Sequence, residues 1–182
     1  MFNAAAPARL VAMGDEHLSA TLRWLVQSGE LRKQVDCLHP PTEAGNAAYW
    51  RSRWEMDNRR DFAIILGDGR HVGNCGLCDI DGARGKAQLW IYLGDSHGRG
   101  YGVAAVDRLL SFAFLELGLN RIYLRVVASN PRARDFYLRR GFVEEGVFRQ
   151  DTRQEEKFVD SIAMSMLASE YRPGVSGHAG GI

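Results

Sequence analysis

The stretch from Gln88 to Leu117 constrains the fold of this chain most, because it joins a strand, a glycine-rich turn and a helix. Residues 88–95 are apolar, aromatic and β-branched, which is typical of a strand. Residues 103–117 carry apolar side chains at the spacing of one helix face. That predicted face consists of Val103, Val106, Leu109, Leu110, Ala113, Phe114 and Leu117.

The turn between this strand and this helix has glycine at positions 98, 100 and 102. A turn without Cβ atoms lets backbone N–H groups converge on one point. The helix that follows directs the positive end of its dipole to the same point. Together these features predict an anion site, most often for phosphate. The alternative is an ordinary glycine-rich turn without a ligand.

Two common phosphate-binding patterns do not fit this turn. A dinucleotide fingerprint needs glycine at its first, third and sixth positions. Counting from Gly98, the sixth position is Val103, and the acidic residue expected about 20 residues further on is missing. A nucleoside triphosphate loop ends in Gly-Lys-Ser/Thr, whereas this turn continues as Gly102-Val103-Ala104.

Two segments resemble signatures of the GNAT N-acetyltransferase superfamily. Residues 97–102 resemble its pyrophosphate loop, Arg/Gln-x-x-Gly-x-Gly/Ala, except that His97 stands where Arg or Gln is usual. Residues 130–142 are similar to its second signature, Asn-x-x-Ala-x-x-Phe/Leu-Tyr-x-x-x-Gly-Phe. The flanking segments 73–77, 120–126, 142–146 and 164–171 resemble the RimJ/RimL-type branch. The resemblance covers residues 9–171.

The pattern of elements predicts a mixed α/β fold in the order β-α-α-β-β-β-α-β-α-β-β. The resemblance implies a GNAT fold, a twisted and mostly antiparallel sheet of six or seven strands flanked by about four helices. We expect one domain over residues 1–171 and a disordered tail over residues 172–182. The expected strands are 9–13, 62–66, 71–81, 88–95, 122–128, 142–148 and 158–167. The expected helices are one capped by Asp15 with Leu18, Leu22, Leu25 and Val26 on its inner face, then 42–57 capped by Thr42, 103–117, and one from Pro131 to before Gly141.

The resemblance implies that acetyl-CoA is the cofactor. Backbone groups of Ile91, Tyr92 and Leu93 would pair with the pantetheine arm like an extra strand, and Asn130 would lie near it. The pyrophosphate would be held by the loop residues Gly98, Arg99, Gly100, Tyr101, Gly102 and Val103.

Tyr137 would act as the general acid that protonates the leaving thiolate. A phenol with a pKa of about 10 stays protonated at neutral pH and can donate to a thiolate whose conjugate acid has a pKa of about 8.5. The alternative is that Tyr137 is a core aromatic residue beside Phe136.

The general base is not assigned by the sequence. Arg125 and Gln88 stand at positions where relatives carry carboxylates. The candidates by location are Glu55, Asp79, Asp81 and Asp151, each of which can also be a solvated surface charge. Deprotonation of the amine through water alone is the other possibility.

Three functions remain open for the acceptor. The first is acetylation of a small-molecule amine, such as an amino sugar, polyamine, amino-acid derivative or antibiotic. The second is acetylation of a protein N-terminus, and the third is a coenzyme-A-binding module without catalysis. Trp50 and Trp54 can be core residues or can line a substrate pocket, with Asp79 as a further substrate candidate. The paired tryptophans indicate an enclosed pocket, which favours the small molecule.

Composition excludes several other classes. A formal charge of +1 gives no bulk field for nucleic acid, and no apolar run approaches the about 18 residues of a membrane span. The N-terminus does not resemble a signal peptide, so we expect a cytoplasmic protein. A homodimer formed through the last strands is a further expectation. Three cysteines argue against a disulfide framework.

The pair Cys75 and Cys78 lies three residues apart on a predicted strand. The two side chains should therefore face opposite ways, so we expect no metal site even with Cys37 and His39 nearby. Residues 121–140 contain six arginines, at positions 121, 125, 132, 134, 139 and 140. They either form a solvated basic face or attract the phosphates of coenzyme A.

Overall fold

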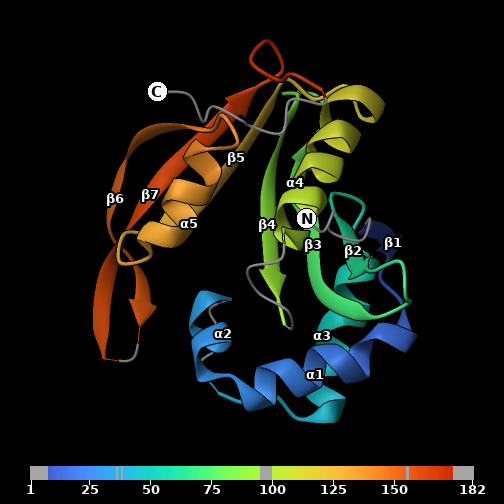
Figure 1. Cartoon of the computed structure of the whole chain (residues 1–182). Coiled ribbons are helices and arrows are strands. Elements are labelled where there is room, and N and C mark those ends of the chain that lie inside the picture. Colours follow the sequence, from blue (N-terminus) through green and yellow to red (C-terminus); the bar gives the residue numbers. More distant parts are fainter. Residues whose placement is uncertain (1–7, 36, 38, 95–99, 155, 174–182) are drawn as a thin grey trace, which may run out of the picture. The chain divides into compact units, whose positions relative to one another are not determined.

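The computed structural model describes residues 8–35, 37, 39–94, 100–154 and 156–173 (Figure 1). Its seven strands form one sheet in the order β1-β2-β3-β4-β5-β7-β6. The pair β4–β5 is parallel, and the pairs β1–β2, β2–β3, β5–β7 and β6–β7 are antiparallel. This confirms the predicted mixed, mostly antiparallel sheet.

The bounds of the elements agree with most of the expected ones. The strands are β1 (Arg9–Ala12), β2 (Arg60–Ile65), β3 (His71–Asp81), β4 (Lys86–Leu93), β5 (Arg121–Val127), β6 (Val143–Gln154) and β7 (Lys157–Leu167). The helices are α1 (Leu18–Gln27), α2 (Gly29–Gln34), α3 (Glu43–Trp54), α4 (Tyr101–Ser111) and α5 (Pro131–Leu138), with short segments η1 (Asp15–His17) and η2 (Phe112–Glu116).

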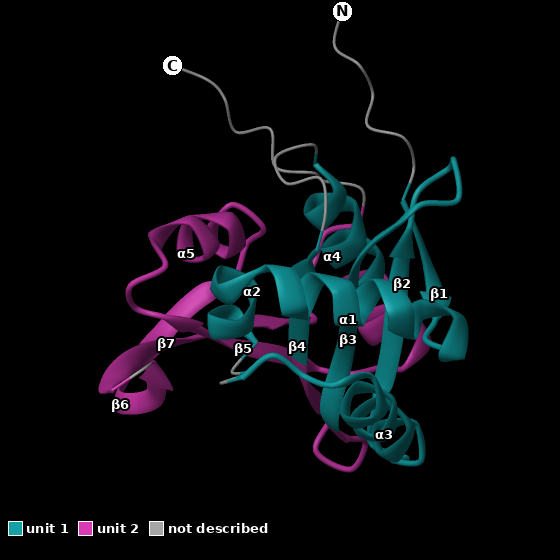
Figure 2. Cartoon of the chain, turned by 90° about the horizontal axis from the view of Figure 1, so that it is seen from below, with its two compact units in different colours: residues 1–79, 89–109 teal, residues 80–88, 110–182 magenta. Residues whose placement is uncertain are grey.

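The chain divides into two compact units, each built from separate parts of the sequence (Figure 2). Unit 1 comprises Met1–Asp79 and Leu89–Leu109, and unit 2 comprises Ile80–Gln88 and Leu110–Ile182. The boundaries fall inside β3, β4 and α4 rather than in linkers. The single domain over residues 1–171 stays a prediction, and most of the expected tail lies outside the described residues.

Unit 1 packs helices on β2 and β4 through two apolar clusters. Trp50 of α3 packs with Met13, Ala63 and Ile65, and Trp24 of α1 packs with Leu25, Leu31 and Tyr92. The alternation of Ala63 and Ile65 places both side chains on the same face of β2. These contacts place α1 and α3 against the strands that carry the site described below.

The first helix differs from the prediction. Asp15 is not the cap of α1 but the first residue of the 3₁₀ segment η1, and Gly14 precedes it. Because this segment has about three residues per turn, the inner face of α1 shifts. Its buried residues are Thr21, Trp24 and Leu25, whereas Val26 is 48% exposed.

Helix α2 has no counterpart among the expected helices. It has six residues, too few for a periodic apolar face to show in the sequence. The Ser28 side chain caps it by accepting from the Leu31 N–H at 3.1 Å. By contrast, the Thr42 cap of α3 is confirmed, since its hydroxyl accepts from the Gly45 N–H at 3.1 Å. Helix α3 ends at Trp54, three residues earlier than expected.

Unit 2 contains the second signature segment. Asn130 accepts from the Ala133 N–H at 3.1 Å and Pro131 is the first residue of α5, as predicted. The helix lies along β5 and β7 (Figures 1 and 2). Strand β6 runs six residues beyond the expected end at Phe148, through an irregular register between Phe148 and Thr152 where Gln150 has φ of 52°. The alternation of apolar and polar residues is lost there, so the sequence did not reveal this extension.

Gly76 on β3 tests how closely the strands of unit 1 approach one another. A Cβ at this position would lie 2.4 Å from the carbonyl oxygen of Arg60, a backbone atom on the neighbouring strand. We expect Gly76→Ala to lower the free energy of unfolding by about 1 to 3 kcal/mol, measured by urea denaturation. Gly67→Ala is the matched control, because nothing lies within 4 Å of its added Cβ. Equal stability of both variants would contradict the close approach.

Candidate acceptor cavity

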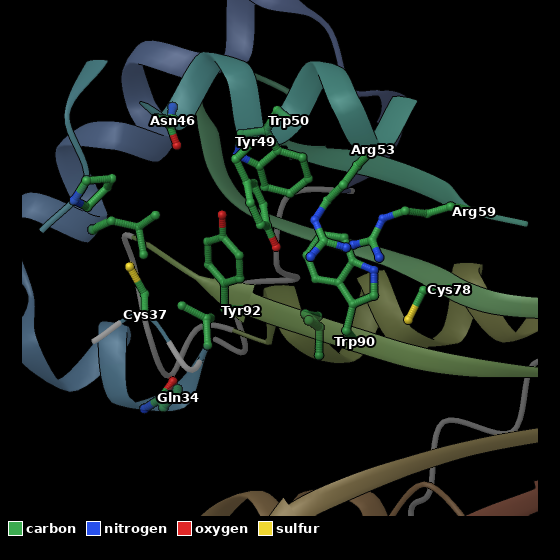
Figure 3. Close-up of a pocket in the computed structure, with 14 residues that line it drawn as sticks. Gln34, Cys37, Asn46, Tyr49, Trp50, Arg53, Arg59, Cys78, Trp90 and Tyr92 are labelled. Atoms are coloured by element: carbon green, nitrogen blue, oxygen red, sulfur yellow. The ribbon is translucent and has the colours of Figure 1, made fainter. Parts of the chain in front are cut away.

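A cavity of about 550 Å³ opens within unit 1 (Figure 3). Its volume lies in the range of about 300 to 1,000 Å³ that is usual for small-molecule sites. Its walls come from the α1–α3 region, the segment before β2, and strands β3 and β4. The lining residues are Leu25, Gln34, Val35, Cys37, Pro41, Asn46, Tyr49, Trp50, Arg53, Arg59, Cys78, Trp90, Ile91 and Tyr92.

Aromatic rings form one continuous wall of this cavity. The ring of Trp50 on α3 lies 5.9 Å from that of Trp90 on β4, which in turn lies 6.0 Å from that of Tyr92. The Tyr49 ring meets Trp50 edge-on at 5.5 Å. Aromatic pairs at such distances are mutually attractive in tilted and edge-on arrangements. The wall therefore offers flat apolar surfaces for a ligand.

Two arginines reach the cavity from different elements. Arg59 Nε donates to Asp61 Oδ2 at 2.7 Å, and its guanidinium lies 5.3 Å from the centre of the Trp90 ring. Arg53 of α3 lies over the Tyr49 ring at 4.2 Å. In Figure 3 both guanidinium groups converge near Trp90. The ring faces attract the cations and help to hold them in place.

Asp61 lies behind this arginine pair with only 2% of its side chain exposed. Burial raises the pKa of its carboxyl, although the nearby Arg59, Arg53 and Trp90 act in the opposite direction. Its Oδ1 atom has no hydrogen-bond partner among the described residues. A half-satisfied buried carboxylate is less stable in its charged form.

A buried polar network supports the cavity from the other side of Tyr92. Asn74 Nδ2 donates to the Tyr92 hydroxyl at 2.6 Å and to Thr21 Oγ1 at 3.0 Å. Its Oδ1 lies 2.7 Å from His71 Nε2, which is also 3.0 Å from the Gly73 carbonyl. Two acceptors near Nε2 place a ring proton on that nitrogen. Burial lowers the His71 pKa and raises that of Tyr92.

The structure brings together only some of the predicted site residues. Trp50, Ile91 and Tyr92 line the cavity, and Cys78 does too. Trp54 packs instead against the Met13–Trp50 cluster, and Asp79 is exposed with φ of 51°. These two residues are not among those that line the cavity.

The glycine loop is described only in part. His97, Gly98 and Arg99 lie outside the described residues. Gly100 has φ of 78°, a conformation that favours glycine. Tyr101 begins α4, two residues earlier than expected, and Gly102 and Val103 follow it in the first turn.

The candidate bases do not gather at the cavity. Glu55 is exposed, and Asp81 binds Arg84 at 2.8 Å, which lowers its pKa. Asp151 binds Arg125 at 2.9 Å. Within the described part of the chain, the cavity lining contains no Asp, Glu or His.

Unit 2 holds the predicted general acid in a packed environment. Tyr137 is buried and meets Phe136 and Phe142 edge-on at 5.1 and 5.4 Å. Among the six nearby arginines, Arg121, Arg125 and Arg134 pair with Glu145, Asp151 and Glu144. These pairs favour the interpretation of that segment as a structural face.

The two cysteines of β3 differ in burial. Cys75 is fully buried, whereas Cys78 lines the cavity. Among the residues that the structure describes, no cluster of three or more His, Cys, Asp or Glu could hold a metal ion. None of the helices in those same residues is long and apolar enough to cross a membrane.

The sequence did not single out Arg53, Arg59 or Trp90 as site residues. One signal was present, because Arg53 follows Tyr49 by four positions and Trp50 by three and so shares their helix face. A second was Asp61, which shares its strand face with the apolar Ala63 and Ile65. A carboxylate at such a buried position needs a cationic partner.

Asp61→Asn tests the physical cost of the buried carboxylate. Because burial raises its pKa in the folded state, Asp61 contributes most to stability below its ordinary pKa of 3.8. That contribution is lost as the pH rises through the raised value. We expect the stability of wild type relative to Asp61→Asn to fall as the pH rises above about 4, measured by urea denaturation. A relative stability that grows with pH would contradict this account.

Comparison with known proteins agrees with this architecture. Residues 8–143 match the family model described as acetyltransferase (GNAT) domain. The chain is 32% identical over 112 residues to the uncharacterized N-acetyltransferase p20 of Bacillus licheniformis, covering 60% of this chain and 63% of that protein. It is 32% identical over 113 residues to spermidine N(1)-acetyltransferase of Vibrio cholerae serotype O1, covering 62% and 65%. The matches thus span just under two thirds of these relatives.

Among solved structures, spermidine N-acetyltransferase from Vibrio cholerae in complex with CoA and spermine has a similar fold. The TM-score is 0.83 at 23% identity, covering 91% of this chain and 98% of that one. The match of the family model to most of the chain shows that this protein belongs to the GNAT acetyltransferase family.

Proposed function

We propose that this protein is an acetyl-CoA-dependent N-acetyltransferase that acts on a primary amine of a small molecule. The observation that carries this proposal is the cavity beside β4, lined by Ile91 and Tyr92 and walled by aromatic rings. GNAT acetyltransferases use acetyl-CoA, and a structure of similar fold contains CoA. A cavity of this size accommodates a small acceptor.

Strand β4 supplies the proposed pantetheine site. Its described pairing with β5 covers only the pairs from Lys86–Arg121 to Gln88–Tyr123. The backbone groups of Ile91, Tyr92 and Leu93 would hydrogen-bond the pantetheine arm as an added strand does. The amides of the glycine loop and the start of α4 would bind the pyrophosphate, with Asn130 near the pantetheine.

The transfer would proceed directly in a ternary complex. The neutral amine attacks the acetyl carbonyl, the C–N bond forms, and the C–S bond breaks. Tyr137 donates its phenolic proton to the departing thiolate, and the amine proton leaves through water. The acetyl carbonyl and the amine need only be held in the geometry for attack, and a rigid aromatic cavity would provide it.

Two other functions are kept as alternatives. Acetylation of a protein N-terminus, the reaction implied by the resemblance to the RimJ/RimL-type branch, needs an open groove for an extended peptide. A coenzyme-A-binding module without catalysis would bind CoA but release none from acetyl-CoA. Among small molecules, the spermidine acetyltransferase relative favours a polyamine.

A thiol-release assay with acetyl-CoA and a panel of amines tests the activity and the role of Tyr137 together. We expect amine-dependent CoA release by the wild-type protein. Tyr137→Phe keeps the ring that packs on Phe136 and Phe142 but removes the donor. It should lower kcat by about 10²-fold or more while the acetyl-CoA affinity changes little. Equal losses of turnover and affinity, or no loss of either, would remove Tyr137 from this role.

Gly102→Ala tests the proposed pyrophosphate loop. An added Cβ would lie 3.7 Å from Leu93 Cδ1, an ordinary contact, so the fold should tolerate it. Gly100 is a poorer choice because its φ of 78° makes any side chain strained. We expect Gly102→Ala to weaken CoA binding in a calorimetric titration by obstructing the ligand.

His97→Gln is the comparison variant in the same titration. It should change CoA affinity little, since the proposed contacts of the loop are backbone amides. The opposite ranking of the two variants would mean that the loop has another role.

A further inference from the structure

We propose that the acceptor carries a carboxylate as well as its amine, and that Arg53 and Arg59 bind this carboxylate beside the aromatic wall of the cavity. The transfer step rests on the proposed function, whereas the carboxylate site is a binding property that can be measured without turnover. The proposal follows from three observations on the charge, the geometry and the shape of the cavity.

The cavity lining is cationic. Arg53 and Arg59 line it, and no carboxylate of the described residues does. The Asp61 carboxylate accepts one hydrogen bond from Arg59 Nε and compensates the charge of Arg59. Arg53 makes a cation–π contact with Tyr49 and has no carboxylate within salt-bridge distance among the described side chains. Among the described residues that line the cavity, the charged side chains are thus both arginines.

The two guanidinium groups point to the same place. They come from α3 and from the segment before β2, and they converge near Trp90 (Figure 3). Two like charges held close together repel each other. An oxyanion between them attracts both guanidinium groups and so offsets this repulsion. The planar, multidentate guanidinium group is well suited to a carboxylate. Arg59 uses Nε for Asp61, which leaves its two terminal nitrogens as further donors.

The shape of the cavity places this charge beside flat apolar surfaces. Trp50 and Trp90 lie 5.9 Å apart between ring centres, and Arg59 lies over Trp90. A ligand that reaches the arginines with its carboxylate would pack its apolar part on these rings. An amino-acid derivative or a short peptide combines an amine, an apolar part and a carboxylate in one small molecule.

The same features disfavour a polyamine at this site. A polyamine is a chain of positive charges and binds best where several carboxylates face the ligand. Here it would meet two cations and no lining carboxylate of the described residues. Like charges at close range in a partly buried cavity repel each other strongly. The acceptor class thus differs from the one named for the spermidine acetyltransferase relative.

The first test measures binding with matched neutral and anionic probes. Phenylacetate and phenylacetamide have nearly the same shape but differ in charge. Their binding can be followed by the fluorescence of the cavity tryptophans, with CoA present. We expect the wild-type protein to bind phenylacetate at least about tenfold more tightly than the amide, as for a hydrogen bond to a charged group.

Arg53→Gln should remove most of this discrimination, whereas Arg51→Gln should leave it unchanged. Arg51 lies on the same helix and is 59% exposed, with an ion pair to Asp15, so its loss changes the net charge equally at little cost in stability. Arg53 is preferred to Arg59 because loss of Arg59 would leave the buried Asp61 without its cation. Equal binding of both probes to the wild type would overturn the proposal. So would discrimination that persists in Arg53→Gln.

The second test measures turnover with three amines. Glycylphenylalanine and its C-terminal amide have the same amine and differ only at the C-terminus, which is a carboxylate in one and an amide in the other. Spermidine represents the polyamines. We expect kcat/KM for the carboxylate to exceed that for the amide by about tenfold, and this ratio to collapse in Arg53→Gln but not in Arg51→Gln.

The outcomes separate the two proposals. A preference for spermidine or for the amide would overturn the carboxylate site while leaving the acetyltransferase in place. Discrimination between the two phenyl probes without CoA release from any amine would overturn the proposed function and keep the carboxylate site.

Discussion

The buried amide of Asn74 is the contact on which the rest of unit 1 depends. It joins β3 to β4 through the Tyr92 hydroxyl, to α1 through Thr21, and to the start of β3 through His71. A fully buried amide has to satisfy its donors and its acceptor internally, so these partners have a single workable arrangement. Since Tyr92 is both a member of this network and a wall of the cavity, the same contact sets the position of the aromatic surface.

The two arginines that line the cavity differ in what they support in unit 1. Arg59 compensates the buried Asp61, while Arg53 rests on Tyr49. Breaking the first pair would leave a charge buried without its partner, which is destabilising. A change at Arg53 removes no such partner. A substitution at Arg53 can therefore change which ligands the cavity binds while the Arg59–Asp61 pair stays in place.

Local chemistry explains which parts of the structure the sequence could predict. The Thr42 and Asn130 caps depend on side chains close to the helix ends, and both were located correctly. Helix α2 has only six residues, and the far half of β6 lacks an alternation of apolar and polar residues, so no periodic pattern predicts either segment. The aromatic wall was half predicted through Trp50, but Arg53 and Arg59 could not be assigned to one cavity, because spacing within an element does not show what faces it across the fold.

The stacking of rings and guanidinium groups also bears on the entropy of recognition. Arginine side chains are long, and ordering one on binding costs about 0.5 to 1.5 kcal/mol. Here Arg59 is already fixed between Asp61 and Trp90, and Arg53 rests on Tyr49. That loss of freedom occurs when the chain folds, before any acceptor arrives. The cavity is thus preorganised, and a ligand of the right charge and shape can bind it without first reshaping it.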